Sequence, residues 1–293
     1  MRRAYEDRLR ERTLHPDNLQ GDGAAQVSAR RAAARQRSSS GGPAGAWLTA
    51  LPGGPLTMGD DTFDLAFWHR LGFRVPVTGP LPHDCDDADP VLAEDEAMVS
   101  KAVAKKTQLR HDILAAALRL VISSASLPSA AEPRYRTIAG RVVKNQRRGD
   151  ILVVMPQLRM AAVDVVVSHA PAKSYCDQAA LTSGHVADTM ERRKRAKFQK
   201  DVPSHVEFQF VPFAVESCGY MGKAALGFVG RLGDVAAGSG RISKSAFVRW
   251  AMQVLSVALQ KGNADMYRAF GLVISREQGS RFDPGHEIPV LQS

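Results

Sequence analysis

Residues 147–155 read Arg-Arg-Gly-Asp-Ile-Leu-Val-Val-Met, and after a short polar break residues 161–169 read Ala-Ala-Val-Asp-Val-Val-Val-Ser-His. Both runs are apolar and rich in β-branched residues, which is the pattern of a strand buried on both faces. Asp150 stands at the start of the first run and Asp164 lies inside the second. A carboxylate is costly to bury without a partner, and two carboxylates on paired strands can meet at a divalent metal ion. The stretch therefore predicts two adjacent strands that carry a metal site.

Basic residues lie on both sides of these two strands in the sequence. Those before them are Arg134, Arg136, Arg141, Lys144, Arg147 and Arg148, and those after them are Arg192, Arg193, Lys194, Arg195, Lys197 and Lys200. Carboxylates that can hold a metal ion within a positively charged surround are typical of phosphodiester chemistry on a nucleic acid.

Length, composition and charge limit the class of protein. The chain has 293 residues, 44% of them hydrophobic, which is enough for a core in one large domain or two small ones. Its formal net charge of +9 favours a polyanionic partner, nucleic acid before membrane. The longest apolar stretch, 113–122, is interrupted by Arg119 and is too short to span a bilayer.

The first residues of the chain and its cysteines indicate the cellular compartment. The first residues lack the apolar region of a signal peptide and contain acids, which argues against a transit peptide. Cys85, Cys176 and Cys218 are too few and too scattered for a disulfide framework or a cysteine zinc site. We therefore expect an intracellular protein, nuclear or cytoplasmic, with no membrane partner.

Four regions are expected along the chain. Residues 1–43 form a basic N-terminal segment with some helical character, which ends in a Ser- and Gly-rich flexible linker at 38–43. Residues 44–96 form a connector with a short helix over 60–72 and a solvated acidic loop at 84–96. Residues 97–237 hold the main domain, and residues 238–293 hold a C-terminal helix and a polar tail.

The periodicity of the main domain predicts an α/β (α+β) fold. A long helix over 97–123 has Leu109, Ile113, Ala116, Leu120 and Val121 on one face. The elements expected after it are strands at 142–143, 151–155 and 163–167, a helix over 175–200, a strand over 206–215, and helices over 221–236 and 245–260. This order predicts a mixed sheet flanked by helices.

Six short motifs follow one another in a family-like order. They are Gly-Ala-Trp-Leu-Thr-Ala-Leu-Pro at 45–52, Leu-Arg-His-Asp at 109–112, Arg-Gly-Asp at 148–150, Asp-Val-Val-Val at 164–167, Lys-Arg-Ala-Lys-Phe at 194–198 and Phe-Val-Pro-Phe-Ala-Val-Glu at 210–216. This order resembles the restriction-like endonuclease region downstream of the polymerase in non-LTR (LINE-type) retrotransposon polyproteins, as a truncated or degenerate copy. The resemblance covers about residues 44 to 237. It implies the PD-(D/E)xK endonuclease fold, whose core order is αβββαβ.

The resemblance also assigns roles to individual residues. Asp150 matches the first nuclease acid, with Gly149 where the family has Pro, and Asp164 matches the second; together they would hold Mg²⁺ or Mn²⁺. The catalytic lysine would be Lys194 or Lys197 on the following helix. For His111, a structural role and a phosphate contact both remain open. The nucleic-acid contacts implied are Arg110, His111, Arg147, Arg148, Arg192, Arg193 and Arg195.

The zinc-binding part of the family pattern is incomplete in this chain. A zinc knuckle normally precedes the Arg-His step, but this interval offers only His83 and Cys85, so no zinc is expected. The expected function is a metal-dependent DNA endonuclease that nicks target DNA in association with reverse transcription, with element RNA as a further partner. The alternative is an inactive remnant that binds nucleic acid through its basic surface.

Simpler interpretations of the same residues also exist. Asp150 alone fits a turn residue, and the basic run at 191–200 alone fits a solvated helix face. Glu216 fits a third metal ligand or a capping or core-edge carboxylate, and the sequence favours a capping or core-edge role over a metal ligand.

Overall fold

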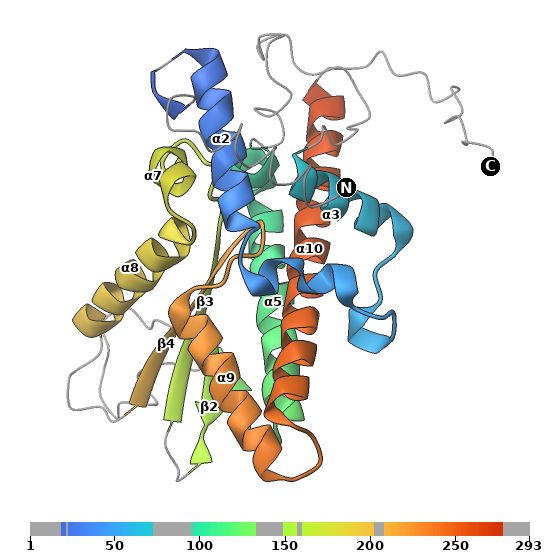
Figure 1. Cartoon of the computed structure of the whole chain (residues 1–293), viewed down its shortest axis with the longest axis vertical. Helices are drawn as coiled ribbons and strands as arrows, with labels where there is room; N and C mark the ends of the chain where they lie inside the picture. The colour runs from blue at the N-terminus through green and yellow to red at the C-terminus, as the bar shows by residue number, and fades with distance from the viewer. Residues whose placement is uncertain are drawn as a thin grey trace, which may run out of the picture.

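A four-stranded mixed sheet flanked by helices forms the centre of the protein (Figure 1). The computed structural model describes residues 19–21, 23–72, 95, 97–132, 149–156, 160–201 and 208–277. The strands are β1 (Ser129–Ala131), β2 (Ile151–Val154), β3 (Met160–Ser168) and β4 (Phe208–Glu216), in the order β1-β2-β3-β4. The first three are antiparallel neighbours, and β4 runs parallel to β3. The prediction of an α/β fold with a mixed, helix-flanked sheet is confirmed.

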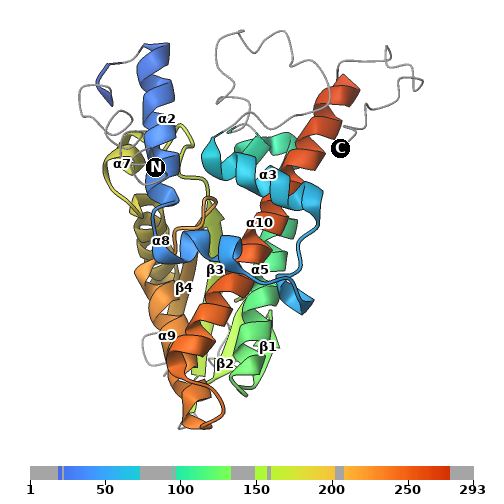
Figure 2. The ribbon, with the colours of Figure 1, turned by 45° about the vertical axis from the view of Figure 1, so that its right-hand side comes forward.

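Helices occupy both sides of this sheet (Figure 2). They are α2 (Ala24–Ser38), α3 (Asp60–Leu71), α5 (Ala104–Ser124), α7 (Cys176–Leu181), α8 (His185–Asp201), α9 (Lys223–Gly238) and α10 (Lys244–Glu277), with short 3₁₀ helices at Gly42–Thr49, Gly54–Leu56 and Lys101–Val103. The helices expected over 60–72 and 221–236 and the strands expected at 151–155, 163–167 and 206–215 are confirmed to within a few residues.

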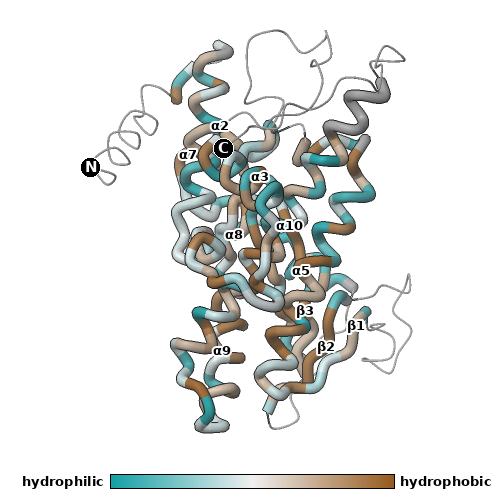
Figure 3. Tube along the Cα trace, turned by 90° about the vertical axis from the view of Figure 1, so that its right-hand side faces the viewer, coloured by the Kyte–Doolittle hydropathy of each residue, from teal (hydrophilic) through white to brown (hydrophobic). Residues whose placement is uncertain are grey.

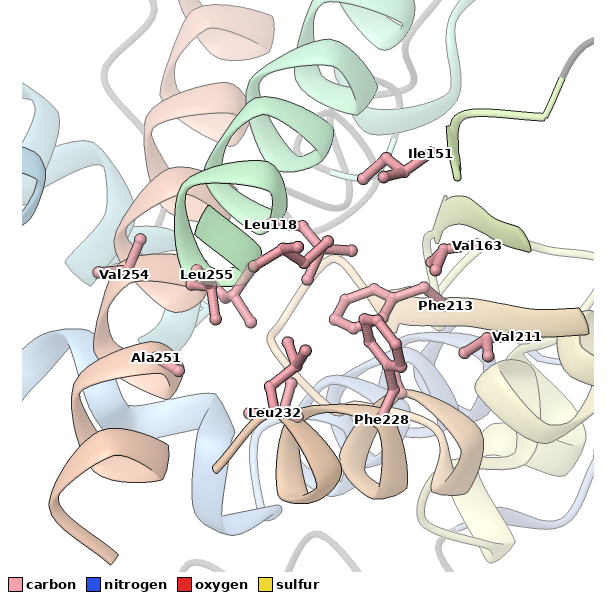
Figure 4. Close-up of a cluster of buried hydrophobic side chains, with 14 of the residues drawn as sticks. Leu118, Ile151, Val163, Val211, Phe213, Phe228, Leu232, Ala251, Val254 and Leu255 are labelled. Atoms are coloured by element: carbon pink, nitrogen blue, oxygen red, sulfur yellow. The ribbon is translucent and has the colours of Figure 1, made fainter. Parts of the chain in front are cut away.

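The main hydrophobic core lies between the sheet and helices α5, α9 and α10. Alternate strand residues point to this side, and those in β2 and β3 are buried except Val167, which is half-buried at the end of β3. Figure 4 shows Phe213 of β4 meeting Phe228 and Leu232 of α9, with Leu118 of α5 and Leu255 of α10 closing the cluster. In Figure 3 the hydrophobic colour is strong along β2 and β3. Because α10 shares this core, the helix predicted after residue 238 belongs to the same packed body.

Helix α8 packs on the opposite face of the sheet. Phe198 of α8 stacks on Phe210 of β4 with ring centroids 4.1 Å apart and planes 15° from parallel. At the other end of α8, the backbone N–H groups of Val186 and Ala187 donate to Glu216 Oε1 at 3.1 and 3.0 Å. Glu216 is therefore a helix-capping carboxylate, one of the two roles that the sequence favoured, since it satisfies free amides at the helix start.

Several predicted elements need correction. The helix predicted over 175–200 is two helices, α7 and α8, because the chain turns at Gly184, whose φ of +75° favours glycine. The helix predicted over 245–260 extends from 244 to 277. The structure adds the short strand β1, whereas the strand predicted at 142–143 lies outside the described residues.

The buried face of α5 also differs from the predicted one. Leu109 and Leu120 were expected in the core but are 36% and 42% exposed. Val121 of the predicted face is buried, but the residues that form the buried stripe with it are Leu114, Leu118 and Ile122. Apolar residues surround most of this helix, so the sequence contains two competing stripes, and the position of the sheet selects one of them.

The prediction of a flexible linker at residues 38–43 was wrong. Ser38 is the buried last residue of α2, and the following 3₁₀ helix Gly42–Thr49 buries Ala44 and Trp47. The Arg37 Nε–H group donates to the carbonyl oxygen of Ala180 at 2.6 Å, which fixes the end of α2 to α7. A Ser- and Gly-rich composition is compatible with order where neighbouring elements supply such contacts.

A second buried region, mainly polar, joins α2, α3 and α10 to the ends of β3 and β4. Asp95 accepts hydrogen bonds from Arg31, Arg35 and His169 at 3.3, 3.1 and 2.7 Å. His69 Nδ1 lies 2.6 Å from the Tyr267 hydroxyl. Burial, with nearby arginines, lowers the pKa of His69 well below its ordinary value; burial also lowers the pKa of His169, although Asp95 opposes the shift.

These two histidines predict a loss of stability in acid. Their pKa values in the folded protein lie below the unfolded value of about 6.5. Below a pH of about 6.5 the unfolded chain therefore binds protons that the folded protein does not. The free energy of unfolding should fall by up to ~1.4 kcal/mol per pH unit for each such proton. Urea unfolding at pH 7.5, 6.5 and 5.5 would measure this, and His69→Gln should make the dependence shallower. An unchanged slope in that variant would contradict the assignment.

Candidate functional site

The register of β2 and β3 brings the two predicted acids together. Ile151 pairs with Val163 in this antiparallel ladder, so the preceding residue, Asp150, lies opposite Asp164. Residues that are directly opposite share one face of a sheet, with Cβ atoms roughly 4.5–5.5 Å apart. The two carboxylates interact with each other and are four-fifths buried. This face of the sheet is the one that α8 covers.

Each carboxylate is also held by a donor from a different helix. Asp150 Oδ2 lies 3.0 Å from His111 Nε2 of α5, and it accepts a hydrogen bond from the backbone N–H of Val165. Asp164 Oδ1 accepts a hydrogen bond from Lys194 Nζ of α8 at 2.9 Å. The hydrogen bonds to these protein donors use one oxygen of each carboxylate, and the other oxygen is available to the opposite acid or to a cation.

The environment shifts the pKa values of the two acids in opposite directions. Burial raises the pKa of Asp164, and the negative charge of Asp150 raises it further, although Lys194 partly offsets both effects. Burial also disfavours the charged form of Asp150, but the hydrogen bond from His111 and its positive charge lower the pKa of Asp150 overall. Asp150 is therefore the more firmly ionised member of the pair.

His111 is held between two acids. Its Nδ1 lies 3.0 Å from Asp112 Oδ1, and Gln108 Nε2 donates to the same carboxylate oxygen at 2.7 Å. The hydrogen bond with Asp150 raises the pKa of His111 to about 9, with burial opposing and Asp112 adding to the shift. At neutral pH the imidazolium therefore compensates Asp150, which favours the structural role that the sequence left open.

The donor set suits a hard divalent cation better than zinc. Asp150 and Asp164 offer carboxylate oxygens, and no group of three or more His, Cys, Asp or Glu side chains that could hold a metal forms within the described residues. Mg²⁺ is commonly bound through one or two carboxylates, with water and substrate phosphate completing its shell, whereas a structural zinc site needs four ligands. The pair therefore fits Mg²⁺ or Mn²⁺. His83 and Cys85 lie outside the described residues.

Of the two candidate lysines, Lys194 is the one that reaches the acids. Lys197 lies three residues further along α8 and is exposed, as are Arg192, Arg193 and Arg195. Arg193 is turned toward Tyr175, whose hydroxyl accepts its Nη1–H at 2.9 Å. Arg147 and Arg148 lie outside the described residues.

The prediction that Arg110 contacts nucleic acid was wrong. Its side chain is 2% exposed and donates from Nη1 to Asn263 Oδ1 of α10 at 3.1 Å. Burial lowers the pKa of this guanidinium to about 10. Neighbouring residues on a helix differ by about 100° in direction, so Arg110 faces α10 while His111 faces the acids.

A second arrangement, which no sequence pattern indicated, resembles a catalytic triad. Ser217 Oγ lies 2.7 Å from His169 Nδ1, and His169 Nε2 lies 2.7 Å from Asp95 Oδ1. All three residues are at most 4% exposed, so a substrate has no access to the hydroxyl. We interpret this chain of hydrogen bonds as structural. Its members are far apart in the sequence, and no local pattern links them.

Comparisons with protein-family models and with curated proteins found no match to this chain. In the part of the chain that the structure describes, none of the helices combines the length and the hydropathy of a membrane-spanning segment.

The opposite pKa shifts predict opposite effects of neutralising the two acids. Asp164→Asn should raise the free energy of unfolding at pH 7.5 by about 1 kcal/mol, because the fold disfavours this charge. Asp150→Asn should lower it by ~1–3 kcal/mol, because charge-assisted hydrogen bonds are lost. Urea unfolding in EDTA measures both. Changes of the same sign would show that the two acids have similar environments.

Proposed function

We propose that this protein is a metal-dependent DNA endonuclease of the PD-(D/E)xK type, derived from a retrotransposon. The observation that carries the proposal is the opposed pair Asp150 and Asp164 with the Lys194 ammonium 2.9 Å from Asp164. Two acids on neighbouring strands and one lysine beside them are residue types that suit phosphodiester hydrolysis at a metal ion.

The order of the elements supports this proposal. Helix α5, strands β1 to β3, helix α8 and strand β4 occur in the αβββαβ order that the resemblance implies, with the short helix α7 added between β3 and α8. The acids lie immediately before β2 and within β3, and the lysine lies on α8, the second of the two helices between β3 and β4. The lysine of this fold can occupy that helix when it is absent from the strand, where Val166 stands here.

In the proposed reaction the protein residues have separate tasks. Asp150 and Asp164 would hold Mg²⁺ or Mn²⁺, which would polarise the scissile phosphate and lower the pKa of a bound water. Lys194, which donates to Asp164, would orient the attacking water or offset the charge that develops on the phosphate. His111 keeps Asp150 ionised and fixes its orientation through Oδ2.

The exposed face of α8 supports a polyanionic substrate. Arg192, Arg193, Arg195 and Lys197 lie within one and a half turns of the helix that carries Lys194. Positive side chains there would bind backbone phosphates and bring the scissile bond to the acids. The second candidate, an inactive protein that binds nucleic acid, is favoured by the hydrogen bonds from His111 and Lys194, which already satisfy one oxygen of each acid.

Cleavage of supercoiled plasmid separates the two candidates. With Mg²⁺ the endonuclease should nick the plasmid, whereas Asp164→Asn should remove activity and Lys194→Ala should lower it about 100-fold. Asp234 and Lys244 form a matched ion pair of 2.7 Å outside the site, so Asp234→Asn and Lys244→Ala should cleave normally. Wild-type protein that shifts DNA in gels but never nicks it would favour the inactive binder.

The salt dependence of binding tests the basic face of α8. Changing Arg192, Arg193, Arg195 and Lys197 to Gln should reduce the slope of log K against log salt by about 3 to 4 on duplex DNA. A control with the same loss of charge changes the exposed residues Arg119, Lys223, Arg241 and Arg249, and its slope should stay near that of the wild type. Equal slopes in the two quadruple variants would show that the α8 face makes no specific contact.

A further inference from the structure

The face of the sheet that carries the two acids is only partly covered. Leu152 and Val154 of β2 and Met160 of β3 point to this face, because their ladder partners and the two-residue period place them with Asp164. All three are half-buried, whereas Ile151 and Val163, which point to the opposite face, are fully buried. Apolar side chains therefore remain accessible beside the acids.

An aromatic pair borders the same surface. Phe210 of β4 is the ladder partner of Ala162, two residues from Asp164 and roughly 7 Å along the strand. Phe198 stacks on Phe210 and lies one helical turn beyond Lys194. Both rings are half-buried. We call the five side chains Leu152, Val154, Met160, Phe198 and Phe210 the apolar platform.

We infer that the apolar platform binds an unpaired nucleobase of the substrate. A single nucleotide is long enough to present its phosphate to the acid pair and its base to a platform that begins roughly 7 Å away. Aromatic rings stack on bases of any sequence, and such platforms lie beside cationic side chains that follow the backbone. Lys197, the residue before Phe198, provides such a cation on the same helix.

This inference rests on the proposed function and specifies its substrate. The bases of an intact duplex are enclosed in the stack and reach a protein ring only after they are extruded. The enzyme should therefore act on a strand that is single or contains an unpaired nucleotide at the cleavage site. The charge of α8 favours this occupant over an apolar peptide or a second copy of the chain, which would leave the surrounding arginines uncompensated.

Binding without cleavage tests the platform directly. Fluorescence anisotropy in EDTA would compare a labelled single strand, the matching duplex and that duplex with a three-nucleotide bulge. Phe198→Leu and Phe210→Leu should each weaken binding of the single strand and the bulged duplex about tenfold, with little change for the intact duplex. The control is Phe63→Leu, which alters another stacked pair, Phe63 and Phe67, on α3, and it should bind as the wild type does. A single-stranded RNA of the same sequence would show whether the sugar matters.

A second variant covers the case in which the leucine substitutions disturb folding. Phe198→Trp retains an aromatic ring, so this variant should bind normally. The tryptophan fluorescence that it shows in addition to that of the wild type should be quenched when the single strand binds. Unchanged affinities in both leucine variants, or an unquenched tryptophan, would overturn the inference while leaving the proposed function intact. A wild-type protein that binds none of the nucleic acids at low salt would overturn both. A wild-type dimer that becomes monomeric in the leucine variants would identify a second copy as the occupant.

Discussion

Two negative charges lie side by side in the ladder between β2 and β3, and the arrangement around them follows from compensating these charges. The register sets Asp150 opposite Asp164, and four-fifths of each side chain is withdrawn from water. One positive group comes from α5, as His111, and the other from α8, as Lys194. These helices lie on opposite faces of the sheet (Figure 2), so the site is formed where the two layers meet at one end of β2.

The two faces of the sheet have different tasks. The face toward α5, α9 and α10 holds the continuous apolar core and supplies most of the burial that stabilises the fold. The other face holds the acids, a half-buried apolar surface and α8, whose direction is fixed by Glu216 at one end and by Phe198 toward the other. Raised pKa values and partial exposure are tolerated on this face because the core does not depend on it.

The buried polar region around Asp95 fixes the N-terminal part of the described chain to the sheet. One carboxylate receives hydrogen bonds from two arginines of α2 and from His169 at the end of β3. Removing one partner of such a buried group leaves the others without compensation, which is costly. Helix α2 is therefore integrated with the domain that the sequence had separated from it by a linker.

Local patterns in the sequence determined β2, β3, β4, α3, α9 and the two acids, because β-branched runs and helical periodicity depend on neighbours in the chain. They also placed both acids on adjacent strands, but they did not determine the register that sets the acids opposite each other. Only the tertiary structure decided that Lys194 rather than Lys197 reaches Asp164, that Arg110 is buried, and which stripe of α5 enters the core. Each of these outcomes depends on which distant element lies against a given helix face. Arg110 and His111 are consecutive residues of α5, so their side chains point about 100° apart, and one is buried while the other belongs to the site. The sequence pattern of a helix that is apolar on several sides does not determine which side faces the core.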